Sequence, residues 1–453
     1  MKSPVRAAFF IAAKKIRTGV LPVKELGVGI IGFGTVGAGV AQCLLENGDI
    51  IARRDGVRLV LKRVADLDIT TDRGVKIPDG VLTTNAMEAI EECDIIVELV
   101  GGTTIAKTFI LEALKRGKPV VTANKALLAK FGEELFAEAE KTDADIYYEA
   151  SVGGGIPIIK SLREGFSGNR INSMYGILNG TCNYILTRME RTGEDFDVVL
   201  KDAQKLGYAE ANPSLDIDGF DTAHKTAILA SLAYGKWFGM DPVYVEGITN
   251  VSMNDIRCAA SLGYKIKLLA IIKQDPETEK LEIRVHPTLI PVNSMLASVN
   301  DVFNAVRVDG DYVGNTLFYG RGAGRQATAS AVVGDIVDVA LNLIDGVKQR
   351  VPSYNNANLF TELVPMDEIE TRCYLRFTVA DKPGVLAKIT NILASADISI
   401  SSLIQNETKD EDFATLVIVT HKAKESAIKD AIAAIEKLED VTSNIKMIRI
   451  EDI

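Results

Sequence analysis

The residues best placed for chemistry lie between Glu210 and Lys225. Glu210, Asp216 and Asp221 put three carboxylates into one short segment, and Lys225 follows Asp221 by four residues. Residues four apart share a helix face, and this face continues through apolar residues toward a core. Such carboxylates can hold a substrate ammonium, and a desolvated Lys225 can exchange a proton with a hydroxyl or carbonyl oxygen. A structural salt bridge is the alternative.

A second lysine, Lys125, follows the apolar pair Val120–Val121 and the residues Thr122-Ala123-Asn124. This spacing puts Lys125 at the carboxyl end of a parallel strand, where open α/β sheets bind ligands. A cation at a helix start is disfavoured by the helix dipole, so its presence needs another reason. We therefore expect either a catalytic residue here or a surface lysine that opens the next helix.

Two neighbours offer rival chemistry. His224 stands beside Lys225 and has the side chain most used for general acid–base work. It falls on a different helix face from Asp221 and Lys225, so we expect it to be structural. Cys182 suggests a thiol nucleophile, but no histidine is near it in sequence and cysteine is often simply buried. We expect no covalent role for Cys182.

The glycine turn Gly32-Phe33-Gly34-Thr35-Val36-Gly37 stands between the apolar run Val28–Ile31 and a helical pattern. Gly32 allows the tight turn, Gly34 lets the backbone approach a pyrophosphate, and Gly37 permits close helix–strand packing. The free N–H groups of the helix start would then face the phosphates. With strand and helix in place, the motif predicts dinucleotide binding.

The preference between NAD and NADP stays open. Asp66, at the end of the second strand, could bond a ribose 2'-hydroxyl, whereas nearby Arg63 could bind a 2'-phosphate. Asp66 lies further from Gly32 than the usual spacing of about 20 residues. We therefore expect an extended first helix or an extended loop after it.

The elements that must position these residues read as an α/β, Rossmann-type, doubly wound nucleotide-binding domain. Its later strands are expected at 59–65, 94–100, 119–122 and 145–149, with helices at 105–116 and 126–141 between them. After Glu149 the run Ser151–Pro157 breaks this rhythm. Residues 151–325 then mix helices and strands as an α+β substrate-binding and dimerisation domain, and a helix over 327–344 returns to the nucleotide domain.

The C-terminal part predicts a ferredoxin-like domain. Its strands are expected at 373–380, 398–405, 413–420 and 441–450, with helices at 385–395 and 423–438, in the order βαββαβ. The expected domains are a poorly ordered basic leader at 1–23, the nucleotide domain at 24–150 plus about 326–345, the substrate domain at 151–325, a polar, proline-punctuated linker at 346–372, and the last domain at 373–453.

Composition limits the class of protein. With 453 residues, 47% hydrophobic and 25% charged, the chain reads as a globular protein of several domains. The net charge of -10 gives no basic footprint, so we expect no nucleic-acid partner. Five scattered cysteines favour the cytoplasm, and no apolar stretch approaches the roughly 20 residues of a membrane span. The leader fits a secretory signal poorly, because its apolar run is short.

Together these segments resemble homoserine dehydrogenase over most of residues 26–345. The motifs that carry the resemblance are GFGTVG, VELVGG, VVTANKALLA, YYEASVGGGIPII, ILNGTCNYIL, GYAEANPSLDIDGFDTAHK and GRGAGRQATASAVVGD. The resemblance implies reversible NAD(P)H-dependent reduction of L-aspartate 4-semialdehyde to L-homoserine, in the branch toward threonine and methionine. One departure is Thr103-Thr104-Ile105-Ala106, where the family more usually begins this helix with a proline-containing sequence.

The resemblance also implies roles for single residues. Lys225 would be the proton donor and acceptor, and Lys125 would lie between nicotinamide and substrate. Glu210, Asp216 and Asp221 would position the amino acid's ammonium and hydroxyl groups. Further cofactor contacts would come from Gly180, Gly322 and Gly324, and a sodium ion would be held largely by the carbonyl oxygens of Glu149, Val152, Gly154 and Ile156, oxygen ligands that suit a hard cation.

The stretch from Cys373 onward resembles an ACT domain, with the turn Asp381-Lys382-Pro383-Gly384 between its first strand and helix. Such domains commonly pair and bind an amino acid, so the resemblance implies a homodimer or homotetramer and an effector such as threonine. Two rivals remain: another ACT-containing amino-acid dehydrogenase, such as one acting on prephenate, and a non-catalytic sensor of a dinucleotide and an amino acid.

Overall fold

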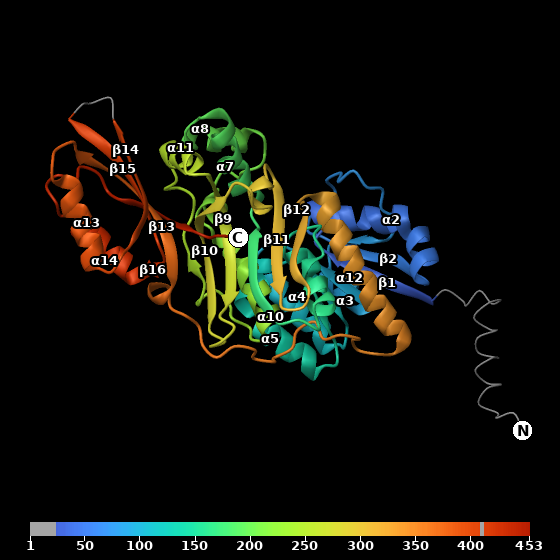
Figure 1. The fold of residues 1–453 in the computed structure, drawn as a ribbon. Helices are drawn as coiled ribbons and strands as arrows, with labels where there is room; N and C mark the ends of the chain where they lie inside the picture. The colour runs from blue at the N-terminus through green and yellow to red at the C-terminus, as the bar shows by residue number, and fades with distance from the viewer. Residues whose placement is uncertain (1–23, 408–411) are drawn as a thin grey trace, which may run out of the picture.

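The computed structural model describes residues 24–407 and 412–453, so the predicted basic leader lies outside the described residues (Figure 1). Three regions follow one another across the view. The nucleotide-binding region, blue, is at one end, the C-terminal region, orange to red, is at the other, and the region between them is green to yellow.

The nucleotide-binding region is a parallel sheet of order β3-β2-β1-β4-β5-β6, as predicted for a doubly wound fold. Its strands are β1 (Lys24–Ile31), β2 (Val57–Ala65), β3 (Leu82–Thr83), β4 (Ile95–Glu98), β5 (Val120–Thr122) and β6 (Ile146–Tyr147). Its helices are α2 (Thr35–Asp55), α3 (Ala86–Glu92), α4 (Thr104–Lys115) and α5 (Lys125–Lys141). The 21-residue length of α2 accounts for the wide spacing between Gly32 and Asp66.

A late helix, α12 (Arg325–Asp345), returns to this region and packs against α2. Gly39 permits the contact, because a Cβ there would lie 2.8 Å from the Arg325 carbonyl oxygen. By length and composition α12 could cross a membrane, but 56% of its apolar window is buried inside the protein. Its apolar face includes Val332, Ile336 and Val339 in the core of the nucleotide-binding region, so α12 is a core helix.

The remaining strands form one mixed sheet of order β12-β11-β7-β9-β10-β17-β13-β15-β14. The middle region supplies β7 (Ile171–Ile177), β9 (Tyr264–Gln274), β10 (Leu281–Pro291), β11 (Phe303–Gly310) and β12 (Gly314–Arg321), with β8 (Tyr244–Val245) beside β10. Its helices are α6 (Ile158–Lys160), α7 (Gly180–Thr192), α8 (Phe196–Lys205), α9 (Ser214–Ile217), α10 (Phe220–Tyr234) and α11 (Met253–Ser261), with short turns η1 (Glu149–Ser151), η2 (Ser161–Gly165) and η3 (Leu296–Ser298).

The C-terminal region has the predicted βαββαβ order, which confirms the ferredoxin-like fold. It contains β13 (Glu370–Ala380), α13 (Val385–Ser395), β14 (Ile400–Glu407), β15 (Phe413–Thr420), α14 (Glu425–Ile435) and β17 (Lys446–Ile450). Several boundaries differ from expectation by a few residues, and two of these differences are the clearest. Residues 423–424 form β16 (Ala423–Lys424) on β13 rather than the start of the helix, and the last strand begins at Lys446 rather than Val441.

One feature of this sheet was not predicted. β17 lies parallel to β10, with Thr288 opposite Arg449 and Leu289 opposite Ile450, and antiparallel to β13. The final strand of the chain therefore joins the sheet of the middle region to that of the C-terminal region.

The segment between α12 and β13 is held against the protein rather than free, and it contains the short turn η4 (Met366–Glu368). It runs under the middle region in Figure 1. The hydroxyl of Tyr148 donates to the carbonyl of Ser353 at 2.7 Å, and the amide of Leu281 donates to the carbonyl of Glu362 at 2.9 Å. The segment predicted as a linker thus packs along the surface and contacts both the nucleotide-binding region and the middle region.

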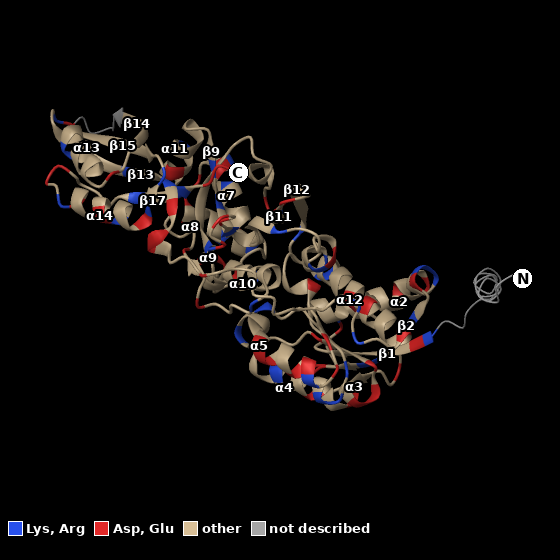
Figure 2. Cartoon of the chain, turned by 60° about the horizontal axis from the view of Figure 1, so that its bottom comes forward, with Lys and Arg blue, Asp and Glu red and all other residues tan. Residues whose placement is uncertain are grey.

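Charge is spread over all three regions. In the view of Figure 2, basic and acidic residues are interspersed along the nucleotide-binding and C-terminal regions. No broad basic face appears in that view.

Candidate active site

The sequence-predicted pair, Asp221 and Lys225, lies on α10, which begins after Gly219. Gly219 has a φ of +90°, a conformation that glycine adopts without a Cβ penalty. α10 is buried along most of its length, and the exposed fractions of Asp221 and Lys225 are 5% and 8%. Two charged groups are therefore held inside the protein, where each must be paired.

Lys225 is held by two acceptors. Its Nζ donates to the carbonyl oxygen of Leu178 at 2.6 Å and to Oδ2 of Asp221 at 2.7 Å. A lysine ammonium has three N–H donors, so one remains for a ligand. The carbonyl of Leu178 also accepts a hydrogen bond from the side-chain amide of Asn304 at 2.8 Å. This second bond helps to fix the position of the carbonyl oxygen that binds Lys225.

Asp221 lies between two lysines. Its Oδ1 is 3.2 Å from Nζ of Lys125, which stands at the start of α5, immediately beyond the end of β5. Burial acts to raise the pKa of Asp221, but the ammonium groups of Lys225 and Lys125 outweigh it and hold the pKa below its usual range. Asp221 is therefore ionised, and it forms ion pairs with both lysines.

Asn179 links the two carboxylates. Its side-chain nitrogen donates to Oδ1 of Asp216 at 2.7 Å and to Oδ2 of Asp221 at 2.8 Å, while its oxygen caps α7 by accepting from the amide of Cys182. The hydroxyl of Thr181 donates to the other oxygen of Asp216 at 3.0 Å. Sequence reasoning missed Asn179, Thr181 and Asn304; an asparagine ahead of a helical run was the available signal for the first.

Two of the candidates, Glu210 and His224, lie apart from this cluster, and a third, Cys182, has a structural role beside it. Glu210 is exposed, and among the described residues its side chain forms no hydrogen bond or ion pair with either lysine. His224 faces a separate cavity beside Lys130 and Phe238. Cys182 is buried, and burial raises the pKa of its thiol well above the usual value. Its Sγ donates to the carbonyl of Asp216 at 3.1 Å, which is a structural contact.

The glycine turn opens onto a cavity of about 600 Å³. Gly32 has a φ of +103°, and a Cβ there would lie 2.6 Å from the carbonyl of Leu99. Beyond Gly34 there is open space, and α2 has no side-chain cap. Among the described residues no acceptor pairs with the amides of Thr35, Val36 or Gly37, so these N–H groups are available to an anion. Apolar side chains complete the cavity: Ile31, Leu67, Met87, Leu99, Val100, Ile105 and Phe109.

Asp66 lines the same cavity, and Arg63 does not. The carboxylate of Asp66 accepts the amide of Phe33 at 2.6 Å and that of Asp68 at 2.9 Å. Arg63 is turned to Glu92, 2.8 Å away, and to the carbonyl of Gly80. Of the two residues that the sequence left as alternatives, Asp66 thus faces the cavity, and Arg63 is paired outside it.

The glycine-rich loop before α12 meets the turn after Glu149. A Cβ on Gly154 would lie 2.5 Å from the carbonyl of Gly322, and one on Gly322 would lie 2.1 Å from the Asn304 side chain. Gly324 caps α12 with a φ of +111°, and Gly180 begins α7 with its Cα close to the carbonyl of Val302. At Gly154 and Gly322 the space excludes a Cβ, whereas at Gly324 it is the positive φ that favours glycine.

The carbonyl oxygens of the turn at 149–156 are unevenly paired. That of Glu149 accepts the amide of Val152 at 3.4 Å, and that of Ile156 accepts the amide of Ile158 at 2.8 Å. Val152 and Gly154 are buried, and within the described ranges no hydrogen bond ends on their carbonyl oxygens. Buried carbonyls normally have a partner, so these two suit a cation.

Three family models match the chain in order. These are the NAD-binding domain of homoserine dehydrogenase over residues 32–149, homoserine dehydrogenase over 157–337, and the ACT domain over 374–440. Homoserine dehydrogenase from Neisseria gonorrhoeae is 45% identical over 95% of this chain and 100% of the relative. The chain belongs to the homoserine dehydrogenase family. It is an NAD(P)-dependent oxidoreductase of amino-acid biosynthesis with a C-terminal ACT domain.

Other members of the homoserine dehydrogenase family agree with this assignment. That from Pseudomonas aeruginosa is 43% identical over 95% of this chain and its own full length. The crystal structure of one from Thiobacillus denitrificans superposes with a TM-score of 0.88, at 43% identity, over 94% of this chain and 98% of that chain. An archaeal homoserine dehydrogenase in complex with NADPH has a TM-score of 0.58 at 28% identity, covering 70% and 98%. Neither the prephenate-type enzyme nor the sensor is favoured.

Proposed function

We propose that the cluster of Lys125, Asp221 and Lys225 is where L-homoserine and L-aspartate 4-semialdehyde are interconverted. The observation that carries this is the third N–H of Lys225, which is left without a partner while the other two are fixed. When bound, the nicotinamide takes up or delivers the hydride. In the reductive direction Lys225 donates its proton to the forming alcohol oxygen, and in the oxidative direction the neutral amine removes that proton.

Each neighbour has a separate task in this proposal. Lys125 is partly exposed and supplies a second positive charge at the mouth of the site, toward a substrate carboxylate or oxygen. Asp216 and Asp221, tied together by Asn179, receive the substrate ammonium. Glu210 joins them only by a change in its exposed loop on substrate binding.

For the nucleotide we propose that Gly32, Phe33, Gly34, Thr35, Val36 and Gly37 hold the pyrophosphate at the start of α2. Asp66 then accepts a hydrogen bond from the 2'-hydroxyl of the adenine ribose, which favours NAD over NADP. Support comes from Asp66 lining the cavity while Arg63 is paired with Glu92. Gly180, Gly322 and Gly324 border the nicotinamide end.

We also propose a sodium site, an amino-acid effector and self-association. The unpaired carbonyls of Val152 and Gly154, with those of Glu149 and Ile156, suit a monovalent cation that braces the turn behind the site. The ACT domain would bind an amino acid such as threonine. Its outer strand, β14, is an edge strand to which a second copy can add in a homodimer or homotetramer. The five cysteines form no disulfide, which fits the cytoplasm.

Initial rates of L-homoserine oxidation, followed by absorbance with NAD+ and with NADP+ separately, test the proposal. Reduction with a preference for NAD+ is the expected result, and inhibition by added L-threonine would assign the effector. Tight nucleotide binding without turnover of either nucleotide would overturn the catalytic assignment.

A further inference from the structure

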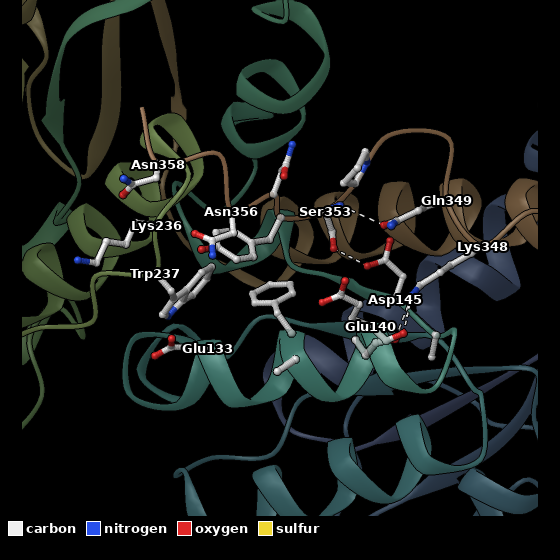
Figure 3. Close-up of a pocket in the computed structure, with 17 residues that line it drawn as sticks. Glu133, Glu140, Asp145, Lys236, Trp237, Lys348, Gln349, Ser353, Asn356 and Asn358 are labelled. Carbon is white, nitrogen blue, oxygen red and sulfur yellow. Dashed lines mark hydrogen bonds between the residues drawn. The ribbon is translucent and has the colours of Figure 1, made fainter. Parts of the chain in front are cut away.

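A second pocket lies at the far end of α5 from the catalytic lysine. Its volume is about 780 Å³, and it is bounded by the second half of α5, the two residues before β6, the residues after α10, and the segment after α12 (Figure 3). α5 begins at Lys125, and its residues that line the pocket, Glu133 to Glu140, lie about 12 to 23 Å further along the helix at 1.5 Å per residue. The nucleotide cavity shares none of its residues.

One wall of the pocket is aromatic. The rings of Phe136, Trp237 and Tyr354 lie 4.8–5.3 Å apart, centroid to centroid. Trp237 is 8% exposed and anchored by its Nε1–H, which donates to the carbonyl of Leu128 at 3.0 Å. Gly132 makes room for the indole, because a Cβ there would lie 2.1 Å from it. This wall is rigid and suits the apolar part of a small molecule.

The opposite side of the pocket carries carboxylates. Asp145 is 4% exposed; its Oδ1 accepts from the amide of Ile146 at 2.8 Å and from the hydroxyl of Ser353. Its Oδ2 is buried and has no hydrogen-bond partner among the described residues. Glu140 lies on the same side of the pocket as Asp145 in Figure 3. Burial raises the pKa of Asp145 to about 6, a cost that a nearby cation would reduce.

Among the described residues neither lysine of the pocket forms an ion pair with Asp145 or Glu140, although the charges of Lys348 and Arg163 act to lower the pKa of Asp145. Nζ of Lys348 donates to the carbonyl of Ala139 at 3.1 Å and so caps the end of α5. Lys236 extends over the ring of Phe360, away from Asp145. The amide side chains of Gln349, Asn355 and Asn356 provide hydrogen-bonding groups around the opening. The pocket thus combines an unpaired buried carboxylate oxygen, a second carboxylate and an aromatic wall.

We propose that this pocket binds a small primary amine, such as a free α-amino acid, with its ammonium at Asp145 and Glu140 and its side chain against Trp237 and Tyr354. Ammonium groups bind favourably both to carboxylates and to aromatic faces. The site is separate from the catalytic cluster and from the ACT domain. It is formed partly by the segment that leads into the ACT domain, so its occupant contacts both the nucleotide-binding region and that segment.

Trp237 is the only tryptophan of the 453-residue chain, so intrinsic fluorescence reports on this pocket directly. We would titrate the full-length protein with three probes of one carbon skeleton: n-butylamine, L-2-aminobutyrate and butyrate. The two amines should change the fluorescence saturably and butyrate should not. Equal responses to butylamine and butyrate, or no saturable response to any probe, would overturn the proposal.

Substitutions at the two carboxylates test whether the amine binds in this pocket. Asp145→Asn keeps an acceptor for Ile146 and Ser353 but removes the charge, and Glu140→Gln changes only an exposed side chain. Each should weaken amine binding, the former by at least about tenfold, because a charge-assisted hydrogen bond is lost. Asp143→Asn is the matched control: its side chain is 90% exposed two residues away and does not line the pocket. A response that survives both test variants unchanged would locate the ligand elsewhere and refute the assignment.

Discussion

The ammonium groups of Lys125 and Lys225 contact opposite oxygens of the Asp221 carboxylate, at 3.2 and 2.7 Å. One carboxylate therefore balances two cations, and the group as a whole keeps one positive charge. In the proposed reaction, this positive charge would stabilise a developing negative charge on a substrate oxygen without any rearrangement of the protein. Asp221 also prevents the two lysines from repelling each other.

Lys225→Met should lower kcat for homoserine oxidation by about 10²–10⁴-fold, the usual contribution of a positioned acid–base group. Nucleotide binding, measured by fluorescence titration of NADH, should not change. Lys201→Met, an exposed site on α8, is the matched control and should keep full activity. Near-normal turnover in Lys225→Met would refute the assignment.

Asn179→Ser separates two tasks of one residue. Serine can still cap α7, but it cannot donate to both Asp216 and Asp221. We expect the KM for L-homoserine to rise by about tenfold or more, since two carboxylates lose their alignment. The melting temperature, measured by calorimetry, should shift only slightly. A large loss of stability with an unchanged KM would show that Asn179 serves only the helix.

Asp66→Ser tests the cofactor preference. Removing the carboxylate takes away the repulsion of a 2'-phosphate, so the ratio of kcat/KM for NAD+ to that for NADP+ should fall by at least about tenfold. Arg63→Ala should leave the ratio unchanged, because this side chain is paired with Glu92 outside the cavity. If Arg63→Ala alone impairs use of NADP+, the assignment of the two residues must be reversed.

Glu98, fully buried at the end of β4, predicts a pH-dependent stability. Burial raises its pKa from 4.5 to about 7. Between these values the folded state binds more protons than the unfolded state, so stability falls as pH rises through this window and is level above it. Glu98→Gln removes this cost, which is on the order of 3 kcal/mol.

Urea unfolding of both proteins at several pH values measures the effect. The advantage of the variant should grow from about pH 5 to about pH 7, the window set by the two pKa values of Glu98. A difference that does not vary with pH would show that Glu98 does not titrate there.

Glu451→Gln should destabilise the protein by about 3 kcal/mol or more, because Arg284 is fully buried and would lose its closest carboxylate, 2.6 Å away. Asp452→Asn changes the next residue, whose ion pair with Arg372 is exposed, and should cost less than about 1 kcal/mol. Chemical denaturation checks both, and equal effects would show that the Arg284 pair contributes nothing special.

The local pattern of apolar and polar residues in the sequence was sufficient to predict much of this fold. Alternating apolar strands and helices predicted the parallel sheet, and the spacing of Asp221 and Lys225 predicted their contact. What could not be predicted depends on residues distant in sequence. Asn304 reaches Leu178 across 126 positions, and Ser353 meets Asp145 across 208. Glu210 belonged to the most suggestive segment, yet its loop leaves it exposed, which residue type alone does not reveal.

The strand β17 connects the ACT domain to the region that carries Lys225 through continuous backbone pairing. Tyr175 on β7 donates its hydroxyl to Glu451 at 3.2 Å, and three residues after Tyr175 the chain reaches Leu178, whose carbonyl holds Lys225. Because β17 is hydrogen-bonded to β10 on one side and to β13 on the other, the ACT domain is fixed to the middle region through the sheet rather than joined to it by a flexible linker alone. If the ACT domain binds an effector as proposed, we expect the effect to pass along this continuous backbone and to reach Lys225 as a small displacement of the Leu178 carbonyl.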